Sequence, residues 1–208
     1  MTTSMTSATD TELTPTAEWR RRILKVGGFI QLAFAAFWLV RGSLNIHGAV
    51  GTLLAALSVV LVVGVVMYAI RASAGVGRRP TSGEAKRIER SVTLATMIEL
   101  VASFGFPVVV IAAGHSDWVL PSIAITIGPL LLWLDHLVHI PRYRPVGWVL
   151  TVGPFILVAT MSGNALAAAT GITAGVLLLG TATAGFHQLA SMPRDQGSTA
   201  EPLTPITP

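Results

Sequence analysis

The chain has 208 residues, of which 52% are apolar and only 12% are charged. Ordinary globular chains carry about 25% charged residues, so this composition excludes a typical water-soluble domain. The chain contains no cysteine, which excludes disulfides, thiolate metal ligands and cysteine nucleophiles. Its apolar residues are gathered in stretches long enough to cross the roughly 30 Å hydrocarbon layer of a bilayer. We therefore expect an all-α, polytopic membrane helical bundle.

Two tails are expected to flank the transmembrane domain. Residues 1–18 are rich in threonine and serine, residues 191–208 are rich in proline, and both compositions predict disorder. Residues 19–190 form the predicted membrane domain. Its six expected spans lie at about 23–41, 49–71, 91–113, 118–139, 147–161 and 165–187.

The last two spans are predicted from a single apolar stretch. Between Pro145 and His187 the chain has no Asp, Glu, Lys or Arg. As one helix this stretch would be about twice as long as a bilayer is thick, so it must fold back. The turn is placed at Ser162, Gly163 and Asn164, which are residue types typical of turns.

Small residues recur four positions apart in the last predicted span. This spacing lets two helices approach closely, and it predicts packing inside the bundle. The pairs are Gly171 with Gly175, Gly180 with Ala184, and Thr181 with Gly185.

The basic residues orient the predicted bundle. Lys and Arg in short connections are retained on the cytoplasmic side of a membrane. With the N-terminus inside, all 14 Lys and Arg except Arg41 fall in cytoplasmic segments. We therefore expect cytoplasmic N- and C-termini and a multi-pass protein of the cell inner (plasma) membrane. The net charge of +4 then requires no nucleic acid partner, and it predicts attraction to anionic lipid headgroups at the cytoplasmic face.

Glu99, which interrupts the third predicted span, is the main candidate for a proton- or substrate-binding residue. An ionisable group inside the hydrocarbon region is costly and usually faces the bundle interior or a water-filled cavity. Glu99 lies eight residues after Ser91, about 12 Å from the inner surface. The alternative is a structural carboxyl that is hydrogen-bonded to a neighbouring helix, for example to Gln31, which lies at a similar depth in the first span.

A second group of candidates, Asp135, His136 and His139, lies at the inner end of the fourth span. On a helix, Asp135 and His139 share one face, and His136 and His139 are also neighbours. A carboxylate and an imidazole there could relay protons, or bind a divalent metal if His187 or Glu99 joined them. The alternative is a set of interfacial side chains that face headgroups or water. We predict no cofactor and no metal site, with Asp135, His139 and His187 as the ligands if a metal is bound.

The segment from Leu130 to Gly147 carries a resemblance to a known group. It contains His139-Ile140-Pro141, followed by Tyr143 and Gly147, after an apolar run. With these residues, about a third of the chain resembles uncharacterised small multi-pass integral membrane proteins of bacteria. Arg144 stands where that pattern has a second aromatic residue. The resemblance supports the membrane assignment and implies no activity for any residue.

Three functions remain open from the sequence. The first is a small transporter or permease-like protein that binds a proton or a small substrate at Glu99, with Asp135 and His136. The second is a non-catalytic membrane subunit or accessory protein that supports another membrane complex. The third is a membrane-embedded enzyme, for which no catalytic residue is predicted. The lipid bilayer is the expected partner, and a protein partner or a homo-oligomer is also open.

Overall fold

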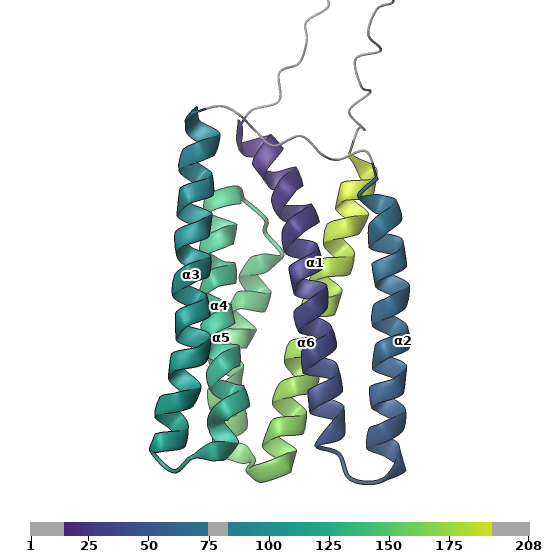
Figure 1. Cartoon of the computed structure of the whole chain (residues 1–208), viewed down its shortest axis with the longest axis vertical. Helices are drawn as coiled ribbons and strands as arrows, with labels where there is room; N and C mark the ends of the chain where they lie inside the picture. The colour runs from purple at the N-terminus through teal and green to yellow at the C-terminus, as the bar shows by residue number, and fades with distance from the viewer. Residues whose placement is uncertain (1–14, 75–82, 193–208) are drawn as a thin grey trace, which may run out of the picture.

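The computed structural model describes residues 15–74 and 83–192, and within these ranges it contains helices and no strand. The six α-helices form an up-and-down bundle (Figure 1). They are α1 (Pro15–Leu44), α2 (Ala49–Ala72), α3 (Gly83–Ala112), α4 (Val119–Val138), α5 (Tyr143–Thr160) and α6 (Gly163–Ser191), and a short 3-10 turn, η1 (Ser116–Trp118), precedes α4. The all-helical prediction is confirmed.

Five of the helices, all except α5, are long and apolar enough to cross a membrane. Such a set is compatible with a multi-pass membrane protein. The exception, α5, has 18 residues and reaches about 27 Å at 1.5 Å per residue. Arg144 and Pro145 lie in its first turn, so its apolar part is shorter still.

The predicted N-terminal tail is too long, because α1 begins at Pro15. Proline is tolerated in the first turn of a helix, since its missing N–H would have no helical partner there. Residues 15–18 are therefore helical. The rest of the two predicted tails, 1–14 and 193–208, lies outside the described residues, as does the segment 75–82 between α2 and α3.

The centre of the bundle is the contact between α1 and α6, which is the most extensive in the structure. The two backbones meet at glycines: a Cβ atom on Gly171 would lie 2.6 Å from Gly42 Cα, and one on Gly175 would lie 2.6 Å from Leu39 Cγ. The prediction that Gly171 and Gly175 pack inside the bundle is confirmed. Gly180, in contrast, faces open space.

The helices α3 and α2 lie at opposite edges of the bundle (Figure 1), where α3 packs mainly on α4 and α2 mainly on α1. No described residue of α3 is buried. Large apolar side chains cover the outside of both helices: Val101 is 72% exposed and Leu53 is 69% exposed. An apolar surface of this extent is unusual for a soluble monomer and is suited to contact with lipid.

The two ends of the bundle differ in charge. At the end where α1 begins, which we call the basic end, α2 ends with Arg71 and α3 begins near Lys86, whereas α5 begins further inside the bundle (Figure 1), with the Tyr143 hydroxyl near Gly27 of α1. At the opposite end, which we call the turn end, short connections join α1 to α2, α3 to α4, and α5 to α6. Arg41, in the last turn of α1, lies at the turn end.

Candidate functional site

A cavity of about 250 Å³ lies in the half of the bundle nearer the basic end, with walls from α1, α3 and α4. This volume is enough for several water molecules. Most of its lining is apolar. The polar side chains that line it are Arg22, Gln31, Thr96, Glu99 and Tyr143.

Glu99 occupies the wall of this cavity and is the middle residue of the apolar span Lys86–Ala112. It lies about 20 Å along the helix from either end of that span. Its side chain is half-buried. The structure therefore places the one carboxyl of the cavity lining at the middle of the apolar span and beside a partly open cavity.

The hydroxyl groups of Ser103 and Thr126 connect the Glu99 carboxyl to α4. Ser103 Oγ, one turn further along α3, lies 2.9 Å from Glu99 Oε1 and 2.6 Å from Thr126 Oγ1 of α4. Thr126 Oγ1 in turn lies 2.8 Å from the carbonyl oxygen of Ile123. Thr126 is 8% exposed, so this end of the chain is closed to solvent. Hydrogen bonds thus connect the carboxyl to a neighbouring helix.

The sequence suggested Gln31 as an example of a structural partner for Glu99, whereas the hydrogen bond of the Glu99 side chain is with Ser103. Gln31 does line the same cavity, and its side chain interacts with that of Tyr143. Tyr143 is 2% exposed and Gln31 is 8% exposed. This buried polar pair leaves Ser103 as the hydrogen-bond partner of Glu99.

The expectation that Asp135 and His139 share a face of one helix is wrong, because α4 ends at Val138; the proton relay stays a prediction. His139 adopts a left-handed conformation with φ 53°, and its backbone N–H donates to the Asp135 carbonyl oxygen at 2.9 Å. Pro141 explains the ending, since the residue before a proline avoids the helical conformation. His139 is a helix cap, and both it and His136 have exposed side chains.

His187 lies near α2 in the structure. Its Nδ1 atom is 3.4 Å from the hydroxyl of Tyr68. Among the described residues, no three His, Asp or Glu side chains come together in a group that could hold a metal ion. Asp135, His139 and His187, the ligands considered for a metal, are therefore not assembled into a site.

Arg142, in the connection between α4 and α5, was not singled out from the sequence. Its guanidinium Nη1 donates to the carbonyl oxygen of Ala184 on α6 at 3.2 Å, and its Nη2 lies close to Gly185. Burial lowers the pKa of Arg142, Tyr143 opposes this shift, and the nearby charge of Arg20 adds to it. Arg142 thus joins the α4–α5 connection to α6 at the basic end.

A second, polar cavity of about 660 Å³ opens at the turn end. Asp117 Oδ2 accepts a hydrogen bond from the backbone N–H of Gly163 at 3.4 Å there, and Asn164 lies 3.3 Å from His47. The polar side chains that line this cavity are Arg41, Asn45, Ser116, Asp117 and Asn164.

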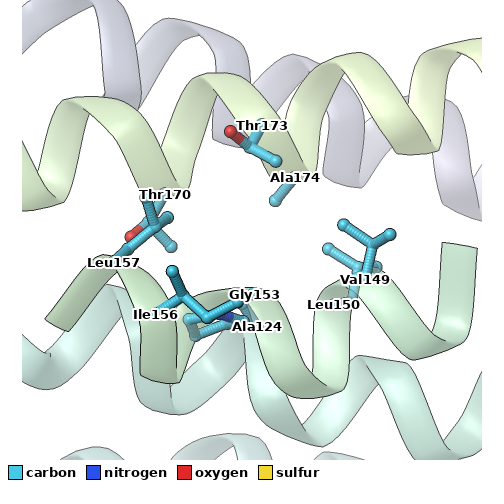
Figure 2. Close-up of a pocket in the computed structure, with 10 residues that line it drawn as sticks. Ala124, Val149, Leu150, Gly153, Ile156, Leu157, Thr170, Thr173 and Ala174 are labelled. Carbon is cyan, nitrogen blue, oxygen red and sulfur yellow. The ribbon is translucent and has the colours of Figure 1, made fainter. Parts of the chain in front are cut away.

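A third cavity, of about 190 Å³, lies between α5 and α6 (Figure 2). Figure 2 shows Thr170 and Thr173 of α6 on one side, with Leu150, Ile156 and other α5 residues opposite. The Thr170 hydroxyl is buried and has no hydrogen-bond partner among the described residues. None of the residues that line this cavity is ionisable. This cavity therefore offers no acid–base group.

Ser103, Thr126 and Tyr143 are the residues of the site that sequence reasoning missed. Ser103 could have been found, because residues four apart lie on the same helix face. Thr126 could have been found from the short α3–α4 connection, which places it at nearly the depth of Ser103. Comparison of the chain with protein-family models, curated proteins and solved structures finds no match in any of the three.

Proposed function

We propose that this protein is a small multi-pass membrane transporter in which Glu99 binds a proton beside a cavity that admits a small solute. The observation that carries the proposal is the position of the carboxyl. Glu99 lies at the middle of an apolar span and on the wall of a partly open cavity of about 250 Å³. A lone charge at the bilayer centre costs about 2.5–3.5 kcal/mol on insertion scales, so such residues usually serve a function.

The proposed topology has six spans, with α5 as the shortest, and both termini in the cytoplasm of a cell whose inner membrane holds the protein. The charge difference between the two ends supports this orientation, because basic connections stay on the cytoplasmic side. In this topology the basic end faces the anionic headgroups of the inner leaflet.

The cavity also limits the kind of solute. Its wall combines many apolar side chains, such as Ile30 and Leu131, with the polar pair Gln31 and Tyr143 and the carboxyl of Glu99. A small, mainly apolar solute with one polar group fits this lining. When such a solute and a proton share Glu99, binding of one changes the affinity for the other, which is the requirement for proton-coupled transport.

The test uses the full chain reconstituted in liposomes on a solid-supported membrane, with a panel of small solutes applied under a pH gradient. We expect a proton-coupled current with at least one solute, and we expect Glu99→Gln to abolish it while the protein stays folded by circular dichroism and size-exclusion chromatography. Asp135→Asn is the matched control, because Asp135 lies outside the cavity lining, and it should retain the current.

Two results would overturn the proposal. A folded Glu99→Gln protein with undiminished currents would remove Glu99 from transport. Loss of folded Glu99→Gln protein, with no current from the parent for any solute, would make the carboxyl structural. That second result favours the alternative function, a non-catalytic subunit that supports another membrane complex.

A further inference from the structure

The oxygen atoms from Glu99 to Ile123 make three consecutive short contacts. These contacts are 2.9 Å from Glu99 to Ser103, 2.6 Å from Ser103 to Thr126 and 2.8 Å from Thr126 to the carbonyl oxygen of Ile123. Each distance is that of an O–H···O hydrogen bond. A hydrogen bond needs a hydrogen atom between its two oxygens, so the chain needs three hydrogens.

With an ionised Glu99 the chain has only two hydrogens. A serine or threonine hydroxyl carries one hydrogen, while a carboxylate and a carbonyl oxygen carry none. If Ser103 donates to Glu99, then Thr126 can donate either to Ser103 or to Ile123, and the other contact places two lone pairs face to face. A contact of 2.6 or 2.8 Å between oxygens without a hydrogen is repulsive. One short contact is therefore unexplained in the ionised state.

A protonated Glu99 supplies the missing hydrogen. We propose that Glu99 is protonated in this conformation and that Ser103 and Thr126 form a hydroxyl chain, which couples the proton to the contact between α3 and α4. The carboxyl O–H donates to Ser103, Ser103 donates to Thr126, and Thr126 donates to the Ile123 carbonyl. Each of the three short contacts then has one hydrogen between its two oxygen atoms.

Loss of the proton reverses the hydrogen bond between Glu99 and Ser103. The carboxyl gives its proton to a water molecule in the cavity and becomes a carboxylate, and Ser103 then donates to it. Thr126 must choose between Ser103 and Ile123, so one of the three bonds is lost. This inference deepens the proposed function and rests on its assignment of Glu99 as the proton-binding group. Ser103 and Thr126 are positioning residues, because they act through Glu99.

The other charged groups near the site add no hydrogen to the contacts between Glu99, Ser103, Thr126 and Ile123. From α1, Arg22 lines the same cavity and takes part in an interaction of its own; from α5, Tyr143 lines it and interacts with Gln31. The lining residues from α4 are apolar. On α3 itself, the nearest ionisable residue described is Arg90, nine residues away, or about 13 Å along the helix.

The experiment is an infrared pH titration of the full chain in vesicles of phosphatidylcholine and phosphatidylglycerol. A protonated carboxyl has a carbonyl stretch that is separate from the amide bands. We expect such a band at neutral pH in the parent and its loss in Glu99→Gln. Ser103→Ala should move the band to higher frequency, because the carboxyl loses its acceptor.

Thr126→Val is the decisive variant. It keeps the side-chain shape and leaves Ser103 free to donate to a carboxylate, so the proton affinity of Glu99 should fall, by roughly two- to tenfold for one hydrogen bond. The matched control is Thr181→Val: Thr181 is buried on α6, and its hydroxyl donates to the Leu177 carbonyl of its own helix. This control should titrate like the parent.

The outcomes separate this inference from the proposed function. If the parent shows no Glu99-dependent band at neutral pH, or if Thr126→Val titrates like Thr181→Val, the hydroxyl-chain inference is overturned, even when Glu99→Gln abolishes transport. If the band and the Thr126→Val shift are both present while no solute gives a Glu99-dependent current, the chain stands and the transport function fails.

Discussion

Gly42 of α1 and Gly171 of α6 bring the backbones of their helices into direct contact. A Cβ atom on Gly42 would lie 2.7 Å from the backbone nitrogen of Ile172, and one on Gly171 would lie 2.9 Å from the backbone nitrogen of Gly42. Neither backbone can move away without separating the two helices. Because lipid tails are as apolar as the helix surfaces, close packing of this kind is a main source of stability in a membrane bundle.

Substitution of Gly171 by alanine should therefore destabilise the bundle. The added methyl group overpacks the α1–α6 contact, with an expected cost of about 1–3 kcal/mol in unfolding free energy. Thermal unfolding in detergent measures the effect. Gly180→Ala is the matched control on the same helix, because a Cβ there meets no atom within 4 Å. Equal melting temperatures for the two variants would contradict the packing described here.

The fold was largely predictable from the sequence because apolar stretches and basic residues alternate along the chain. The helices occupy the six predicted ranges and extend beyond several of them, as α1 does at Pro15. The end of α4 was predicted less well. The sequence interpretation continued the helix through His139, although Pro141 two residues later favours an earlier ending.

Replacement of His139 by glycine should leave the protein folded and slightly more stable. His139 has a φ of 53°, a conformation that glycine adopts at no steric cost, so we expect a gain of up to about 1 kcal/mol. The measurement is the melting temperature, together with transport. His136→Gly should destabilise the protein, because position 136 is inside α4. A loss of transport in folded His139→Gly would support the predicted proton relay.

Tyr143→Phe should destabilise the protein by about 1 kcal/mol, because it leaves the buried Gln31 side chain without its partner. A double-mutant cycle with Gln31→Leu measures the coupling, and the double variant should recover part of the loss. Tyr68→Phe is the control, since Tyr68 is exposed and its contact with His187 is 3.4 Å. Strictly additive effects of the Gln31 and Tyr143 variants would show that the two side chains do not interact.

The absence of native cysteine makes the topology directly testable. Single cysteines at Ser116, Ser162, Pro141 and Ser191 lie at exposed positions near helix ends. A membrane-impermeant maleimide added to intact cells should label the first two and spare the last two until the membrane is opened. Labelling of Pro141→Cys together with Ser162→Cys would show that α5 does not cross the membrane.

The candidate site was predictable in part. Glu99 stands out because it is the one acidic residue between Ser91 and Ala113, and its partner Ser103 follows from helical periodicity. The pair of Gln31 with Tyr143 could not be predicted. It depends on how α1 rotates about its axis relative to α5, and that rotation is fixed by backbone contacts such as Gly42 with Gly171. A single sequence gives the depth of a residue in the membrane more readily than the direction in which its side chain points.

The weak burial of α3 has a consequence for motion. The glycine-lined pair of α1 and α6 makes the most extensive helix contact, whereas α3 is attached mainly through α4 and otherwise presents exposed apolar side chains. A tilt of α3 away from α1 would widen the space beside Glu99 while breaking few contacts within the protein. The ionisable carboxyl is thus carried on the α-helix that has the least contact with the α1–α6 pair.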